Sequence, residues 1–255
     1  MLIHAETTGS GPACVLLHGW GLHGGVWQDT AQALAADHQV ICVDLPGHGR
    51  SAPVAAGATL EDFAAAVAEI LPPRCSLIGW SLGGMVALQL AASLPARIDR
   101  LILVASTPRF VVDTNWEHAL TPEVLERFAD RLRADPADTV RQFLALQVLG
   151  SEQERRTLTR LRALLSTAPA PRPAALDAGL AILREASLLP LLGRITRPVT
   201  LIHGRRDTLI PWTAAQALQV HLPCARLHVL PGAAHAPFLS HADQFLRITR
   251  EALHD

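Results

Sequence analysis

Short apolar runs alternate along this chain with longer segments of helical periodicity. The runs lie at Cys14–Leu17, Val40–Val43, Ser76–Gly79, Leu101–Ala105, Val199–His203 and Arg226–Leu230. Their continuous apolar character is typical of strands that are buried on both faces of a parallel sheet. Helical patterns occur at Val26–Ala36, Leu60–Leu71, Gly84–Ser93, Thr213–His221 and Asp243–Leu253. The alternation predicts an α/β fold in which helices flank a mostly parallel central sheet.

The stretch from Pro108 to Pro190 breaks this alternation, because helical patterns fill it. They lie at Pro122–Ala134, Ala137–Leu149, Gln153–Ser166 and Ala174–Ala186. A separate helical domain is one interpretation. Strand-like sequence resumes at Val199, however, so we expect one core domain (residues 1–107 and 191–255) into which a helical lid (residues 108–190) is inserted.

The most informative motif is the G-x-S-x-G pattern of Gly79-Trp80-Ser81-Leu82-Gly83. An apolar strand pattern enters it and an apolar helix pattern leaves it. This is the setting of a nucleophile elbow, in which a tight turn between strand and helix exposes a serine hydroxyl. Glycines on both sides of the serine are needed because neighbouring backbone lies close to the turn. The motif predicts Ser81 as the nucleophile of a hydrolase.

Two further polar residues follow later strand patterns. Asp207 comes just after Val199–His203, and His235 comes just after the last strand pattern. The order Ser, Asp, His is the one that hydrolases with this elbow use. We therefore predict that His235 accepts the proton of Ser81 and that Asp207 orients the imidazole. In isolation, Asp207 could be a turn former and His235 a surface histidine.

A third motif, His18-Gly19-Trp20-Gly21, follows the first apolar run. Acyl transfer needs donors for the oxyanion of the tetrahedral intermediate. One donor is expected from the N–H of Leu82, which follows the nucleophile, and the other from the N–H of Trp20. An ordinary glycine-rich turn is the alternative interpretation.

Composition narrows the function classes. A net charge of −1 argues against a dedicated nucleic-acid binder. The start of the chain does not resemble a signal peptide, and no apolar run is long enough to span a bilayer. The four cysteines form no CxxC pair, which gives a zinc or redox motif no support. We expect a cytoplasmic monomer that needs neither metal nor cofactor and binds neither membrane nor nucleic acid.

The motifs HGWG, DLPGHGRS, GWSLGG, GRRDTLIP and AAHAPFLSH together resemble the α/β-hydrolase superfamily over nearly the whole chain. The details resemble the bacterial pimeloyl-[acyl-carrier protein] methyl ester esterases of biotin synthesis. These details are the pair Trp20 and Trp80, the lid segment FLALQ and the segment Ala234–Phe238. The resemblance implies a serine carboxylesterase with a V-shaped lid. It also implies a substrate site formed by Trp20, Ser81, Leu82, Phe143, Leu144, Ala145, Leu146, Gln147 and His235.

The same resemblance implies an acidic acyl-carrier protein as partner, received by basic residues of the lid. The candidate docking residues are Arg141, Arg155, Arg156 and Arg160. Acidic residues lie among them, so a solvated helix face of mixed charge is the alternative. Three other functions stay open on this fold: a general short-chain carboxylesterase, a carbon–carbon bond hydrolase and a ligand receptor that retains the triad. A dehalogenase would need a carboxylate where Ser81 stands.

Overall fold

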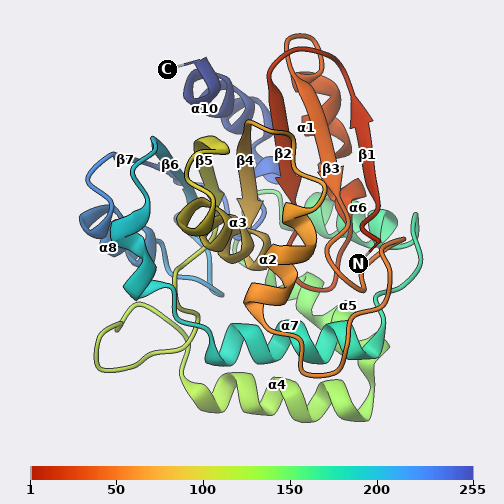
Figure 1. Cartoon of the computed structure of the whole chain (residues 1–255). Coiled ribbons are helices and arrows are strands. Elements are labelled where there is room, and N and C mark those ends of the chain that lie inside the picture. Colours follow the sequence, from red (N-terminus) through yellow and green to blue (C-terminus); the bar gives the residue numbers. More distant parts are fainter. Residues whose placement is uncertain (1, 255) are drawn as a thin grey trace.

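A single seven-stranded sheet forms the centre of the molecule in the computed structural model, which describes residues 2–254 (Figure 1). Its strands are β1 (Ala5–Thr8), β2 (Ala13–Leu17), β3 (Gln39–Val43), β4 (Cys75–Trp80), β5 (Ile98–Val104), β6 (Val199–Gly204) and β7 (Ala225–Leu230). They lie in the order β1-β3-β2-β4-β5-β6-β7. Only β1 is antiparallel to its neighbour. The predicted α/β sheet is confirmed.

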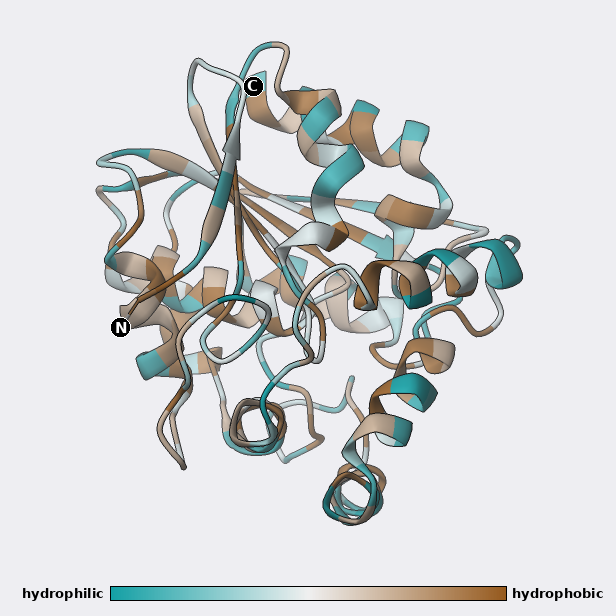
Figure 2. Cartoon of the chain, turned by 90° about the vertical axis from the view of Figure 1, so that its right-hand side faces the viewer, coloured by the Kyte–Doolittle hydropathy of each residue, from teal (hydrophilic) through white to brown (hydrophobic). Residues whose placement is uncertain are grey.

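Both faces of the sheet are buried at strands β2 to β6, which explains why the sequences of these strands are largely apolar. Leu77 packs in one hydrophobic cluster and Ile78, the next residue, in the other. The first cluster includes residues of α2 (Leu60–Ala68), α3 (Leu82–Ser93) and α8 (Trp212–His221). The second includes residues of η1 (Gly24–Trp27), α1 (Gln28–Leu34) and α10 (Ala242–His254). Figure 2 shows the resulting brown, hydrophobic strands between the two helical layers.

Four helices occupy the chain between β5 and β6, in the stretch predicted as a lid. They are α4 (Pro122–Ala134), α5 (Pro136–Leu146), α6 (Glu154–Leu165) and α7 (Pro173–Glu185). In Figure 1, α4 and α7 cross below the carboxyl ends of the strands. The Asp135 side chain caps α5 by accepting a hydrogen bond from the N–H of Asp138 (2.9 Å). The division into core and lid stays a prediction, and "lid" denotes residues 108–190 below.

The structure differs from the predicted elements in detail. It adds the edge strand β1 and two short helical segments, η2 (Leu189–Arg194) and α9 (Pro237–Ser240). The predicted helix Val26–Ala36 is divided into η1 and α1, and α5 ends at Leu146 rather than Leu149. Strand β1 is mostly exposed because only its β3-paired edge is covered, so it has no apolar run to reveal it.

Candidate active site

Ser81 lies in the sharp turn between β4 and α3 and is 3% exposed. Its backbone is left-handed, with φ of 54° and ψ of −118°. This conformation costs an L residue about 1–3 kcal/mol and persists only where the surroundings enforce it. Here the Ser81 N–H donates to Val104 O (3.0 Å), and the Ser106 hydroxyl donates to Ser81 O (2.8 Å). The turn is therefore held from the neighbouring strand β5.

The glycines of the elbow are required by close backbone contacts. A Cβ at Gly83 would lie 2.4 Å from the carbonyl oxygen of Leu17. A Cβ at Gly79 would lie 2.4 Å from the carbonyl oxygen of Gly83. Because backbone atoms cannot swing aside as a side chain can, α3 approaches β2 and β4 this closely only with glycine at both positions.

Asp207 and His235 meet at the carboxyl ends of β6 and β7. His235 Nδ1 lies 2.8 Å from Asp207 Oδ2. The other carboxylate oxygen, Oδ1, accepts the N–H groups of Leu209 (2.9 Å) and Ile210 (3.0 Å). Burial alone would raise the pKa of Asp207, but the His235 charge and the hydrogen bonds from His203 and His235 hold it below its usual range. Asp207 is therefore an anion, and Nδ1 of His235 carries the proton that bonds to it.

The other imidazole nitrogen of His235, Nε2, is buried and has no hydrogen-bond partner among residues 2–254. With the proton on Nδ1, a neutral ring leaves a lone pair on Nε2, which is what a general base needs. The backbone of His235 is fixed twice. Its N–H donates to Gln147 O (3.0 Å), and its carbonyl oxygen accepts from Trp80 Nε1 (2.8 Å). Trp80 directly precedes Ser81, so one side chain links the elbow to the His235 loop.

The HGWG segment follows β2, whose last residue, Leu17, pairs with Gly79 at the end of β4. His18 shapes this loop: its Nδ1–H donates to Gly19 O (2.7 Å), and its Nε2 accepts the N–H of Leu45 (2.9 Å). Burial, and then the neighbouring His48, lower the pKa of His18 well below its usual range. The ring is thus neutral, as both bonds require.

The two predicted oxyanion donors lie at the elbow and in this loop. Leu82 is the first residue of α3, where the backbone N–H has no partner within the helix and the helix dipole favours negative charge. Trp20 is buried, and its indole Nε1 donates to Leu176 O (2.9 Å), the carbonyl of a lid residue. Its ring makes edge contacts with Phe128 and Phe143, at centroid distances of 5.3 and 5.1 Å. The lid therefore packs directly on the Trp20 loop.

The predicted substrate segment Phe143–Gln147 forms the last turn of α5 and its C-cap, Gln147, and its side chains point in different directions. Phe143 packs in the cluster that contains Trp20, while Leu144 packs in the cluster that contains Trp80. Ala145 is half-buried and Leu146 is 39% exposed. Gln147 is buried, with an unpaired Oε1. Consecutive helical residues are about 100° apart, so five in a row cannot all line one site.

A cavity of about 500 Å³ lies within the lid, between α5 and the joint of α6 and α7. Its walls include Val140, Leu165 and Leu176, and Arg141 and Arg162 also line it. Val140 and Leu176 are the side chains that a Cβ at Gly21 would touch, at 3.8–3.9 Å. The cavity therefore borders the loop that carries Trp20.

The four predicted docking arginines differ in whether they form ion pairs within the chain. Arg160 pairs with Asp29 of α1, and Arg141 pairs with Asp138 on its own helix (3.2 Å). Arg155 and Arg156 are exposed and form no ion pair within residues 2–254. Arg162, a further basic residue of α6, lines the lid cavity. Sequence reasoning missed Ser106 and His203, whose side chains bond to the backbone of Ser81 and to the Asp207 carboxylate.

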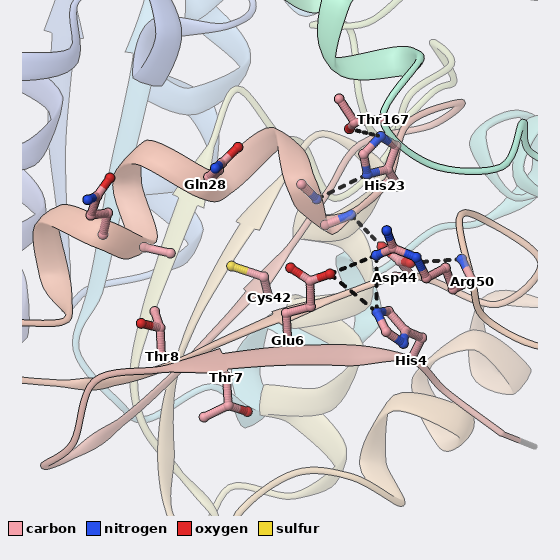
Figure 3. Close-up of a pocket in the computed structure, with 14 residues that line it drawn as sticks. His4, Glu6, Thr7, Thr8, His23, Gln28, Cys42, Asp44, Arg50 and Thr167 are labelled. Atoms are coloured by element: carbon pink, nitrogen blue, oxygen red, sulfur yellow. Dashed lines mark hydrogen bonds and ion pairs between the residues drawn. The ribbon is translucent and has the colours of Figure 1, made fainter.

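Figure 3 shows another cavity of about 500 Å³, which lies at the β1 edge of the sheet, between β1 and α1. In it, Arg50 Nη1 pairs with Glu6 Oε1 (2.7 Å), and Asp44 accepts the N–H groups of Gly24 (2.6 Å) and Arg50 (2.9 Å). No member of the candidate triad (Ser81, Asp207 and His235) lines this cavity. We assign this cavity no part in the reaction.

Within residues 2–254, no three His, Cys, Asp or Glu side chains are grouped so that they could hold a metal ion. No helix of this part of the chain is long and apolar enough to cross a membrane.

Comparison with known proteins establishes the fold family first. A family model described as the alpha/beta hydrolase fold matches residues 12–242. Among solved structures, an esterase from Exiguobacterium antarcticum superposes with a TM-score of 0.91 at 22% sequence identity. The superposition covers 99% of this chain and 96% of that one. At this identity the likeness shows the fold alone, and it confirms the predicted fold class.

Comparison with curated proteins is more specific. The pimeloyl-[acyl-carrier protein] methyl ester esterase of Nitrosomonas europaea is 45% identical over 244 residues, which are 96% of each chain. The protein of that name from Aeromonas salmonicida is 43% identical over 98% of each chain. Such identity over nearly full length confirms the resemblance that the motifs indicated. This chain belongs to the α/β hydrolase fold family and, within it, to the family of the pimeloyl-[acyl-carrier protein] methyl ester esterases.

Proposed function

We propose that this protein hydrolyses the methyl ester of pimeloyl-[acyl-carrier protein] in biotin synthesis, releasing methanol and the free pimeloyl carrier. The observation that carries the proposal is the buried Asp207–His235 pair beside the Ser81 elbow, in a chain 45% identical to an esterase of that name. The protein would act as a monomer in the cytoplasm.

In the first half-reaction, the Ser81 hydroxyl attacks the ester carbonyl carbon while His235 Nε2 takes its proton. The negative charge that develops on the carbonyl oxygen is met by the N–H groups of Leu82 and Trp20. Asp207 stabilises the imidazolium, because its carboxylate stays ionised beside Nδ1. The bond from the carbonyl carbon to the methoxy oxygen then breaks, and methanol leaves with the proton from Nε2.

In the second half-reaction, water attacks the acyl group on Ser81 and His235 Nε2 accepts one of its protons. The bond between the carbonyl carbon and the serine oxygen breaks, and Ser81 regains its proton from the imidazolium. The product is a carboxylate. The apolar surroundings of Trp20 and Phe143 hold a charged group poorly, which favours its release.

Residues 108–190 would act as the lid through which the acyl chain enters. The lid cavity is lined by apolar side chains that border the Trp20 loop, and two arginines also line it. An extended acyl chain fits the apolar walls, while Arg141 and Arg162 suit the phosphate of a carrier's prosthetic arm. Arg155 and Arg156 of α6 would meet the acidic surface of the carrier.

The test compares kcat/KM for the methyl ester of carrier-bound pimelate with that for a small free methyl ester. We expect the carrier-bound ester to be preferred, and its rate to fall more steeply with salt, because salt screens attraction between exposed charges. The double variant Arg155→Glu/Arg156→Glu should reduce the carrier-bound rate far more than the small-ester rate. Arg247→Glu is the control, since Arg247 is exposed and lies on α10, outside residues 108–190.

Ser81→Ala tests the chemistry separately. It should lower the rates of hydrolysis of both the carrier-bound ester and the small ester by several orders of magnitude. Near-wild-type hydrolysis by a purified, folded Ser81→Ala variant would overturn the assignment of the triad. Equal salt sensitivity of the two substrates, or no preference for the carrier, would leave a general carboxylesterase instead.

A further inference from the structure

A second histidine contacts the catalytic carboxylate. His203 is the next-to-last residue of β6, and its side chain is buried. Its Nε2 lies 3.2 Å from Asp207 Oδ2 and 2.8 Å from the carbonyl oxygen of Ile210. Both neighbours are acceptors, so Nε2 must carry the proton and point it between them.

His203 completes the set of donors around Asp207. Oδ1 accepts two backbone N–H groups, from Leu209 and Ile210. Oδ2 accepts from His235 Nδ1 and faces His203 Nε2. A carboxylate has about four lone-pair sites, and here each has a donor. The same Nε2–H also bonds to Ile210 O, so His203 ties the carboxylate to the backbone turn that supports it.

We propose that His203 is a positioning residue that holds the Asp207 carboxylate and thereby sets the proton affinity of His235. Two donors share the negative charge of Oδ2. The more charge His203 neutralises, the less remains to stabilise the imidazolium of His235. His203 does not meet the reacting atoms and acts through Asp207. The inference rests on the proposed triad but not on the proposed carrier substrate.

Other charged groups near this carboxylate are directed elsewhere. Arg205 stacks over the Trp212 ring (4.6 Å), and Arg206 pairs with Glu152 (2.9 Å). Within residues 2–254, the side chains that donate to the Asp207 carboxylate are those of His235 and His203. A change at position 203 should therefore reach His235 through Asp207 alone.

The experiment compares His203→Met, which removes the donor at similar volume, with His203→Gln, whose amide nitrogen can occupy the place of Nε2. The substrate is a small soluble ester, and the readouts are kcat, KM and the acid limb of the kcat/KM profile. For His203→Met we expect kcat to fall about tenfold, equivalent to about 1.4 kcal/mol, with little change in KM. Losing the donor leaves more charge on Oδ2 to stabilise the imidazolium of His235. The acid limb should then move upward by about half to one pH unit.

His203→Gln should keep the acid limb close to that of the wild type and lose less activity than His203→Met. His228→Met, on the neighbouring strand β7, serves as a control for removing a histidine from the sheet. A purely structural role predicts lower melting temperatures with an unmoved acid limb in both variants, and that result would overturn the proposal. If His203→Met does not fold, nitrogen NMR of the wild-type protein decides: the proposal requires a neutral His203 with its proton on Nε2, and a proton on Nδ1 refutes it. Failure of the triad itself would show separately, as activity retained in Ser81→Ala.

Discussion

Two buried tryptophans offer a matched test of the hydrogen bond that links the elbow to the His235 loop. Trp80 and Trp27 are both fully buried, and both pack on Phe238, at centroid distances of 4.9 and 4.3 Å. They differ at the indole nitrogen. Trp80 Nε1 donates to the carbonyl oxygen of His235 (2.8 Å), whereas Trp27 Nε1 is buried without a partner among residues 2–254. Replacing each tryptophan by phenylalanine therefore disturbs packing to a similar extent, but only the Trp80 substitution removes a hydrogen bond.

The expected losses follow from these differences. Each substitution leaves a cavity that costs on the order of 1 kcal/mol. Trp80→Phe also leaves the His235 carbonyl buried and unpaired, which costs about 1–3 kcal/mol more. Trp27→Phe instead removes an unpaired donor, and this offsets part or all of its cavity cost. We expect Trp80→Phe to lose about 2–4 kcal/mol of unfolding free energy and Trp27→Phe at most about 1. For a chain of this size, the difference in melting temperature is roughly 5–10 °C.

Calorimetry and esterase assays on the two variants give the measurement. Trp80→Phe should also lower kcat, because the backbone of His235 keeps only its bond to Gln147 O. Within residues 2–254, Trp27 makes no hydrogen bond or ring contact with Ser81, Asp207 or His235, so Trp27→Phe should keep kcat near that of the wild type. Equal melting temperatures, or a larger loss in Trp27→Phe, would refute the view that this hydrogen bond stabilises the site.

Two further predictions concern the elbow and the thiols. Gly83→Ala should lower both stability and kcat, because the added Cβ would lie 2.4 Å from the Leu17 carbonyl oxygen and displace the loop that carries Trp20. Gly193→Ala is the control: a Cβ there meets open space, so the substitution should be nearly neutral. A fully active, stable Gly83→Ala variant would contradict the packing argument. Burial raises the pKa of Cys42 to about 12 and of Cys75 to about 11, and it raises that of Cys14 further, while Cys224 is exposed. A thiol reagent at pH 8 should therefore label only Cys224 among the four cysteines of the native protein, and all four in denaturant. Fast labelling of a second cysteine in the native protein would contradict this prediction and show that the core opens.

The features that sequence predicted well depend on local rules. Strands β2 to β6 appear as apolar runs because both faces of the sheet are buried there, and the elbow appears because close backbone contacts demand glycine at fixed positions. The edge strand β1 has no such signature. Its residues Ala5–Thr8 are mostly exposed, and pairing with β3 rather than hydrophobic burial defines it.

Side-chain partners were predictable only where a known motif supplied them. His203 stands four residues before Asp207, a spacing that means nothing until the turn after β6 folds the ring back onto the carboxylate. Nothing in the sequence distinguishes Arg160 from the other arginines of α6, yet it pairs with Asp29, which lies more than a hundred residues away in sequence. The first contact depends on the conformation of one turn and the second on tertiary packing, and neither hydrophobic pattern nor residue spacing encodes them.

The contacts between lid and core also limit how the site could open. The turn between α5 and α6 is bonded into the His235 loop: Gln147 O accepts the N–H of His235, and the N–H of Glu152 donates to Gly232 O (3.0 Å). Arg206, next to Asp207, adds a pair to Glu152 (2.9 Å). Moving this turn would disturb the base that the reaction needs. The joint of α6 and α7 borders the lid cavity and is tied to the core away from the candidate triad, for example by the bond from the Arg172 N–H to Gly47 O (3.1 Å). We therefore predict that access opens at this second joint, on the side lined by Arg141 and Arg162.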